Sequence, residues 1–191
     1  MLRRRVALSA VGVLGVLGLL GCGIFAPSNP AASTGLSVPF TLSLERGAAP
    51  DDGILPVEYT CDGAGVSPPL ARDGAPRGTK EFALLMTTLP GDGTTKWTWV
   101  LYRIPSATTS LERGTTGVGV SGAGSHGGTL GYEPPCSHGP GPKAYTFTLY
   151  ALSEPPVLPN DPREVTGDVL TRAILPVTVQ TASFTVSYTR P

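Results

Sequence analysis

The side chains best suited to chemistry are few: three cysteines and two histidines in a chain of 191 residues. Cys61, Cys136 and His138 have the residue types of a disulfide or of a metal site. Outside the cytoplasm, two such cysteines most often pair with each other. A metal site is the alternative, although Cys-x-His is not a standard ligand spacing and the ligand set is incomplete. If the chain is exported, we therefore expect a Cys61–Cys136 disulfide, no metal and no cofactor.

The other histidine, His126, lies in the stretch Ala-Gly-Ser-His-Gly (123–127), which resembles a relaxed nucleophile elbow around Ser125. A genuine elbow joins a buried strand to a helix. Neither is expected beside Ser125, so a hydrolase is the weakest hypothesis. We predict a protein without catalytic residues that is not an enzyme.

The N-terminus has the features of an export signal. Arg3, Arg4 and Arg5 precede an apolar run that ends at Leu20, and Gly21-Cys22 follows. The run has about 15 residues, which suits the apolar region of a signal peptide better than a membrane span. Its end resembles a bacterial lipobox, in which Cys22 carries the lipid (palmitate) and becomes the new N-terminus. An uncleaved anchor and a plain secretory signal are the alternatives.

This pattern predicts three regions: a lipoprotein signal peptide at 1–21, a flexible Pro/Ser-rich tether at 22–36 and a folded domain at 37–191. The protein would be exported to the bacterial cell envelope and attached to a membrane through Cys22. The chain has 14 Lys+Arg against 14 Asp+Glu and no basic cluster after Arg5, so nucleic-acid binding is not supported.

Alternation of apolar and polar residues predicts mostly β-structure. The 25 glycines and 20 prolines disfavour long helices. Strands are expected at 38–45, 55–60, 81–88, 97–104, 144–150 and 182–189, with Trp97, Trp99 and Leu101 on one face. Loops are expected at 61–70 and 114–131. The one candidate helix is 161–175, with Asp161 as its N-cap and Gly167 as a point where it may divide.

Five short motifs occur in the order found in a known family. They are Tyr-Thr-Cys-Asp-Gly (59–63), Ser-Pro-Pro-Leu (67–70), Trp-x-Trp-Val followed by Ile-Pro (97–105), Gly-Tyr-x-x-Pro-Cys (131–136) and Tyr-x-Phe-Thr-Leu-Tyr-Ala-Leu (145–152). In this order the chain resembles the phosphatidylethanolamine-binding proteins, in particular the bacterial Raf-kinase-inhibitor-like branch. The resemblance implies a large central sheet packed on a smaller one, with one or two short peripheral helices. It also implies a small anion-binding pocket and no general enzymatic activity.

The resemblance also places a pocket in this sequence, with most of its polar groups replaced. Thr87 and Leu89 stand where the family has carboxylates, Thr98 and Lys143 stand where it has histidine, and Lys96 stands where it has a pocket-lining tryptophan. The remaining pocket positions are Gly131, Tyr132, Pro134, Pro135, His138 and Tyr145.

We therefore expect a membrane-tethered, non-catalytic binding protein with a degenerate anion pocket. A protein-docking inhibitor or envelope interaction protein with a vestigial pocket is the alternative. The partners would be a small anionic or phospholipid-headgroup ligand, the membrane through its lipid anchor and, in the alternative, another protein.

Overall fold

The computed structural model of the chain describes residues 38–48, 53–136 and 139–191. The predicted signal peptide, the tether, Cys22 and His138 lie outside these described residues. Among the described residues, no helix is long and apolar enough to cross a membrane.

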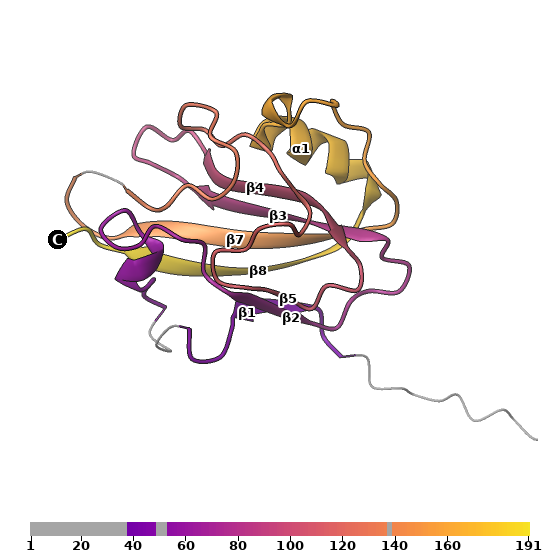
Figure 1. The fold of residues 1–191 in the computed structure, drawn as a ribbon, viewed down its shortest axis with the longest axis horizontal. Coiled ribbons are helices and arrows are strands. Elements are labelled where there is room, and N and C mark those ends of the chain that lie inside the picture. Colours follow the sequence, from indigo (N-terminus) through magenta and orange to yellow (C-terminus); the bar gives the residue numbers. More distant parts are fainter. Residues whose placement is uncertain (1–37, 49–52, 137–138) are drawn as a thin grey trace, which may run out of the picture. The chain divides into compact units, whose positions relative to one another are not determined.

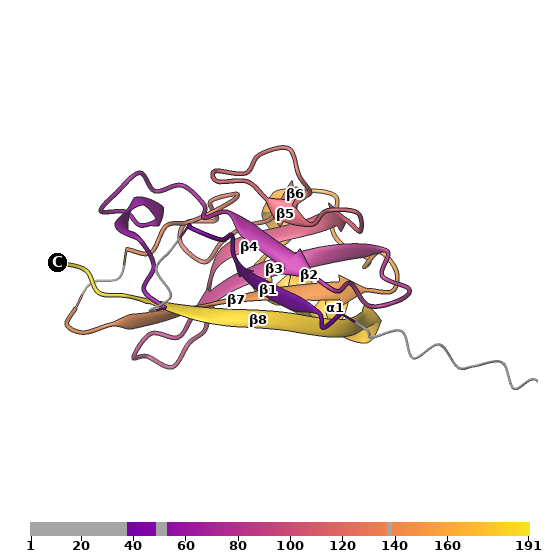
Figure 2. The same ribbon diagram turned by 90° about the horizontal axis from the view of Figure 1, so that it is seen from below.

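The described residues form two antiparallel sheets (Figures 1 and 2). The larger sheet has five strands in the order β6-β4-β3-β7-β8: β6 (Val120–Ser121), β4 (Lys96–Pro105), β3 (Glu81–Thr88), β7 (Lys143–Leu152) and β8 (Thr178–Tyr188). The smaller sheet has three in the order β1-β2-β5: β1 (Thr41–Leu44), β2 (Leu70–Asp73) and β5 (Ser110–Leu111). This architecture confirms the expected fold class.

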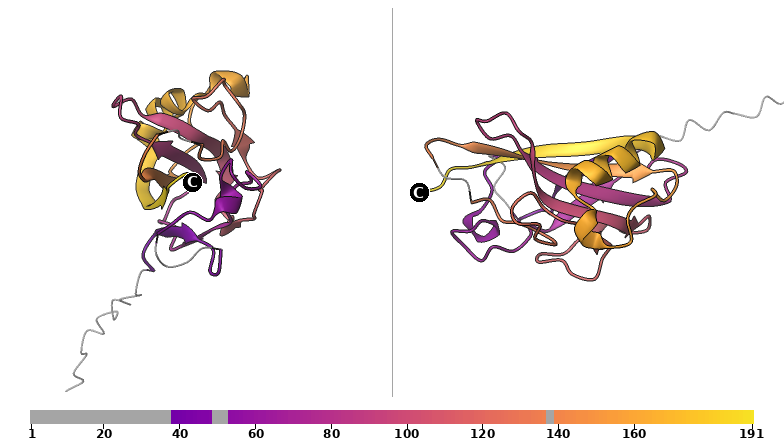
Figure 3. Two further views of the ribbon diagram at one scale, coloured as in Figure 1. Left: turned by 90° about the vertical axis from the view of Figure 1, so that its left-hand side faces the viewer. Right: turned by 90° about the horizontal axis from the view of Figure 1, so that it is seen from above.

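Side chains along the central strand β3 alternate between two faces of the large sheet, one covered by the smaller sheet and the other by α1. Phe82, Leu84 and Met86 face the smaller sheet and belong to the larger apolar cluster. Ala83 and Leu85 face the opposite way, into a second cluster that contains residues of α1 (Gly167–Ile174). Both faces of β3 are covered, and its residues from Phe82 to Met86 are accordingly all apolar and buried. Figure 3 shows α1 lying over the large sheet.

The helical region is shorter than predicted and is divided. A 3-10 turn, η2 (Pro162–Glu164), follows Asp161, and α1 begins only at Gly167. Thr166 caps α1 by accepting a hydrogen bond from the Val169 amide at 3.3 Å. The break occurs because the Val165 carbonyl accepts from the Ala123 amide at 2.9 Å instead of a helical partner. Asp161 therefore caps η2 and not the long helix that we predicted. A third 3-10 turn, η3 (Leu175–Val177), follows α1.

The shortest elements differ most from the prediction. The strand expected at 55–60 is instead a 3-10 turn, η1 (Val57–Tyr59), with Pro56 at its N-cap. Strand β2 begins at Leu70, inside the expected loop 61–70, and β5 was not expected. The expected loop 114–131 contains β6. These strands have two to four residues, too few to show a period of two.

Two irregularities in β4 correct the predicted faces. The register with β3 shifts between Met86 and Thr87, so that Met86 pairs with Trp99 and Thr87 pairs with Trp97. Trp99 consequently lies in the cluster between the sheets, whereas Trp97 packs on the α1 side. The shared face predicted for the two tryptophans was therefore wrong, because Thr98 is an inserted bulge residue. A second shift surrounds Arg103, which has a positive φ of 54°.

The contact between α1 and Trp97 gives a stability prediction. A Cβ placed on Gly167 would come within 2.0 Å of the Trp97 ring. Because this contact cannot be accommodated without moving α1, we expect Gly167→Ala to lower the free energy of unfolding by about 1–3 kcal/mol. Urea denaturation measures the change.

The matched control is Gly91→Ala, because a Cβ at Gly91 would meet nothing within 4 Å. We expect its effect to stay within about 0.5 kcal/mol. Equal effects of the two substitutions would contradict close packing of α1 on Trp97.

Candidate ligand-binding site

A cavity of about 620 Å³ lies at one end of the large sheet. Its walls come from the end of β3 and the residues after it, from the first residues of β4 and β7, and from the chain between β6 and β7. The lining residues are Cys61, Thr88, Pro90, Lys96, Thr98, His126, Thr129, Tyr132, Glu133, Pro134, Pro135, Cys136 and Tyr145. The walls are mostly apolar, with hydroxyl, imidazole, ammonium and carboxylate groups among them.

The outer wall, residues 131–136, is held against β4 by backbone pairing. Tyr132 forms an isolated antiparallel bridge with Trp99, and the Glu133 amide donates to the Thr98 carbonyl at 2.7 Å. The bulge at Thr98 thus lies where the wall meets the sheet. The two aromatic rings meet edge to face with centroids 5.3 Å apart.

The other side of this wall contacts the segment after η1. The Tyr132 hydroxyl donates to the Tyr59 carbonyl at 2.6 Å, and the Cys61 amide donates to the Pro135 carbonyl at 3.1 Å. Burial raises the pKa of the Tyr132 phenol above its ordinary value, so the group stays a neutral donor. The wall is therefore hydrogen-bonded along both edges.

A disulfide between Cys61 and Cys136 closes this contact, as predicted. The Cα atoms are 5.3 Å apart, and the bond closes a loop with a sequence separation of 75 residues. Since each sulfur is bonded to the other, neither is available as a thiolate, and the alternative of a metal site at these two cysteines is excluded.

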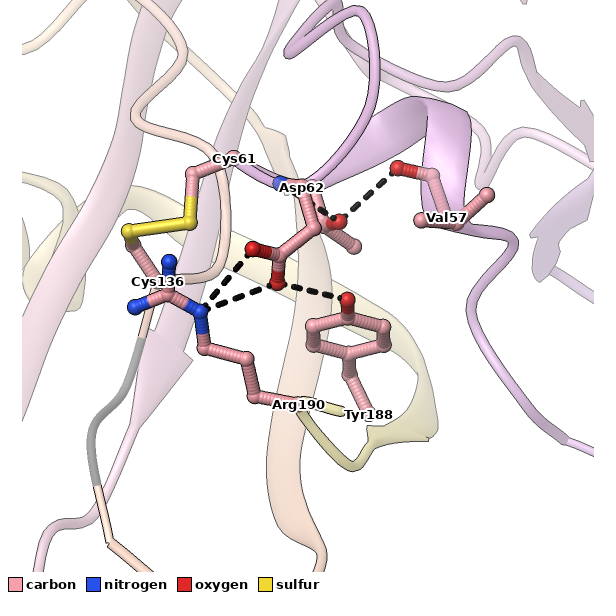
Figure 4. Close-up of polar contacts among 7 residues, drawn as sticks. Val57, Cys61, Asp62, Cys136, Tyr188 and Arg190 are labelled. Atoms are coloured by element: carbon pink, nitrogen blue, oxygen red, sulfur yellow. Dashed lines mark hydrogen bonds and ion pairs between the residues drawn. A yellow bond between two sulfur atoms is a disulfide. The ribbon is translucent and has the colours of Figure 1, made fainter.

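The residue after Cys61 connects the disulfide to the C-terminal end of β8 (Figure 4). The Asp62 carboxylate accepts from the Tyr188 hydroxyl at 2.8 Å and from Arg190 Nε at 2.9 Å. Hydrogen bonds to a charged carboxylate are stronger than those between neutral groups. Residues 61–62, Cys136 and residues 188–190, which are distant in the sequence, therefore meet beside the cavity.

Five residues predicted for the pocket lie around this cavity: Thr98, Tyr132, Pro134, Pro135 and Tyr145. Four others do not line it: Thr87, Leu89, Gly131 and Lys143. The tenth, His138, lies outside the described residues.

Strand alternation and local contacts explain the exceptions. Met86 and Thr88 lie on the same face of β3, so Thr88 lines the cavity and Thr87 faces the other way. Leu89 is 67% exposed. Lys143 is also turned away, with its Nζ donating to the Pro140 carbonyl at 2.9 Å.

Sequence reasoning missed a pair of ionisable side chains, one in the wall and one in the loop before it. His126 Nδ1 lies 2.9 Å from Glu133 Oε2. The Glu133 residue is only 8% exposed, whereas the His126 side chain is 64% exposed at the rim. No sequence period relates the two residues, and Glu133 lies inside a motif that was interpreted for its glycine and prolines. The only signal in the sequence was a glutamate seven residues after a histidine.

Ser125 does not have the environment of a nucleophile elbow. Its hydroxyl accepts a hydrogen bond from the Trp97 amide at 2.9 Å, and its own amide donates to the Trp97 carbonyl at 2.8 Å. The residues after it form a turn and not a helix. Ser125 therefore fastens the loop to β4.

The two packed sheets and the terminal cavity define a β-protein with a small-ligand pocket, and comparison with known proteins identifies its family. The family model described as phosphatidylethanolamine-binding protein matches residues 45–189. A UPF0098 protein of Methanothermobacter thermautotrophicus is 39% identical over 135 residues, covering 68% of this chain and 87% of that protein. The chain belongs to the phosphatidylethanolamine-binding protein family, as its motifs indicated.

Two further relatives bear on export and on the fold. LppC of Mycobacterium tuberculosis, which bears a provisional lipoprotein name, is 34% identical over 125 residues, covering 65% of this chain and 60% of that protein. The crystal structure of CT736 of Chlamydia trachomatis, provisionally described as a phosphatidylethanolamine-binding protein homologue, has a TM-score of 0.71 and 25% identity. It matches over 80% of this chain and 98% of that one.

The disulfide gives a second stability prediction. Because it closes a loop of 75 residues, we expect the double variant Cys61→Ala/Cys136→Ala to lose about 4 kcal/mol of unfolding free energy. Denaturation of the oxidised protein, the reduced protein and the double variant measures this. The reduced protein should match the double variant, and an unchanged midpoint in both would contradict the stabilising role.

Proposed function

We propose that this protein is an exported, lipid-anchored, non-catalytic binding protein whose cavity takes a small anionic ligand. The observation that carries the proposal is the presence of Lys96 and His126 in the lining of one cavity. A cavity of about 620 Å³ is within the range of small-molecule pockets, roughly 300–1,000 Å³.

Anion binding needs hydrogen-bond donors that point at one place and are held by groups behind them. Lys96 supplies an ammonium group and His126 an imidazole. The two threonine hydroxyls of the lining donate to backbone carbonyls instead, Thr98 to Met86 at 3.4 Å and Thr129 to His126 at 3.3 Å. Glu133 holds the His126 ring through Nδ1. The mostly apolar walls favour an anion with a small organic body, such as a phosphate monoester or a carboxylate.

The carboxylates and histidines that the family carries in its pocket are replaced at the corresponding positions of this chain. In this proposal the cavity nevertheless keeps one imidazole and one carboxylate. The imidazole and the carboxylate come instead from the chain between β6 and β7. The pocket would therefore keep the function that the family resemblance implies, with side chains in different places.

Attachment to the envelope is the second part of the proposal. It rests on the lipobox pattern ending at Cys22 and on the lipoprotein name of the relative LppC. The predicted tether would then separate the folded domain from the membrane.

Protein docking is the second candidate function. Leu89 and Leu130 are 67% and 40% exposed, and each neighbours a residue that lines the cavity. Exposed apolar side chains beside a pocket suit contact with a protein surface. This candidate replaces the first if the ligand measurements are negative.

Calorimetric titration with phosphate, phosphorylethanolamine and acetate tests the ligand. We expect at least one to bind, and we expect Lys96→Ala to weaken binding about three- to tenfold, because a half-buried ammonium group is lost. Lys143→Ala is the matched control: it removes the same charge outside the cavity and should leave the affinity unchanged. Absence of binding to all three compounds, or equal effects of the two substitutions, would refute the anion pocket.

Cell fractionation tests the anchor. We expect the wild type in the membrane fraction and a Cys22→Ser variant outside it or retained as precursor, because the lipid-accepting thiol is gone. Labelling with a palmitate analogue should mark the wild type only. Membrane-bound, unlabelled wild type would favour the uncleaved anchor instead.

A further inference from the structure

The His126–Glu133 pair has a geometry that fixes the tautomer of the imidazole. Nδ1 faces Glu133 Oε2 at 2.9 Å, so a proton lies between these two atoms. Glu133 itself is held in place because its amide donates to Thr98 and its side chain is buried. The free nitrogen of the ring is therefore always Nε2.

The protonation of the pair decides what Nε2 can do. With one proton shared between Nδ1 and the carboxylate, Nε2 has a lone pair and can only accept hydrogen bonds. With a second proton on the pair, Nε2–H donates. This holds whether the two protons are described as imidazolium with carboxylate or as neutral imidazole with carboxylic acid. A fully deprotonated oxyanion such as sulfate has no proton to give, so it can bind Nε2 only in the second state.

The Glu133 carboxylate is enclosed on its other side. Glu133 Oε1 is buried and has no hydrogen-bond partner among the described residues. It lies against Gly124, where a Cβ would come within 2.0 Å of it. A buried carboxylate with one unsatisfied oxygen depends on the partner of its other oxygen. Among the described residues, that ion-pair partner is His126.

We propose that binding of a small oxyanion in this cavity is coupled to the uptake of one proton by the His126–Glu133 pair. His126 contacts the anion through Nε2–H, and Glu133 is the positioning residue. This inference rests on the proposed function, since it concerns the same cavity, and adds that the ligand binds more tightly as the pH falls. The protein would then hold its ligand in an acidic medium and release it in a neutral one.

The other ionisable groups that line the cavity, among the described residues, are Lys96 on β4, Tyr132 beside Glu133, and Tyr145 on β7. Burial raises the pKa of the Tyr132 phenol above its ordinary value. Cys61 and Cys136 are bonded to each other and do not titrate. The test is made between about pH 5 and 8, the range in which imidazole side chains in general change their charge.

Sulfate is the suitable probe, because it keeps a constant charge over this range whereas phosphate does not. Calorimetric titrations of the full chain at several pH values, each in two buffers of different ionisation enthalpy, give the affinity and the number of protons taken up. We expect uptake approaching one proton, with affinity falling by up to about tenfold per pH unit at the upper end. Competition between phosphate and sulfate at a single acidic pH tests whether the two anions occupy the same site.

Two variants separate the roles of the pair. His126→Gln can still donate to Glu133 but cannot titrate, so we expect weaker binding without proton uptake. Glu133→Gln keeps an acceptor for Nδ1 but removes the negative charge, so we expect the pH profile to move to lower pH. Lys143→Ala, outside the cavity, should reproduce the wild-type profile. If Glu133→Gln does not fold, His126→Gln at an exposed position still decides the question.

The results distinguish this inference from the proposed function. Sulfate binding with no proton uptake, or uptake that persists in His126→Gln, overturns the proton coupling and leaves the anion pocket standing. No binding of sulfate at any pH, together with no binding of phosphate, phosphorylethanolamine or acetate, overturns both.

Discussion

The cavity depends on one short wall that is fastened along both of its edges. On one edge, Tyr132 and Glu133 pair with the β4 backbone at the Thr98 bulge. On the other, the disulfide and the hydrogen bond from Cys61 to Pro135 hold the wall to the segment after η1. Prolines within the wall have fixed φ angles and few alternative conformations, so little entropy is lost when it is ordered. The polar groups of the wall therefore keep fixed positions relative to those on the sheet.

This fastening explains how the cavity wall can hold a buried carboxylate. A carboxylate is tolerated in a largely apolar wall only if its backbone is fixed and a donor lies within reach. Glu133 meets both conditions, through Thr98 and His126. Of the β4 residues that line the cavity, Thr98 and Lys96, only the lysine is ionisable. The chain between β6 and β7 thus carries an acid and an imidazole, groups that the family resemblance led us to seek elsewhere in the pocket.

The sequence predicted the structure well where a strand is long enough for its alternation of apolar and polar residues to be recognised. Strands of eight or more residues, such as β3 and β7, were predicted within a few residues. The expected export and the number of cysteines predicted the disulfide, and the five family motifs predicted the fold. The sequence was uninformative where a single residue interrupts the period. The bulge at Thr98 reverses the faces of β4, and alternation on β3 moves the cavity position from Thr87 to Thr88. Counting from a family motif without gaps cannot detect either effect. The contact between His126 and Glu133 depends on how a glycine-rich loop folds back, which no local propensity specifies.

Gly124 shows why these residues act as a set. Its Cα lies so close to the buried oxygen of Glu133 that any side chain there would displace the carboxylate. Displacing the carboxylate would free the His126 ring, because Glu133 is what fixes Nδ1. Glycine at 124, histidine at 126 and glutamate at 133 are consequently interdependent, although they share no strand or helix. A member of the family that has the histidine and the glutamate but a side chain at the glycine position cannot form this pair in the same way. The spacing Gly-x-His-x6-Glu, followed by Pro-Pro-Cys, is therefore a sequence criterion for this form of the pocket.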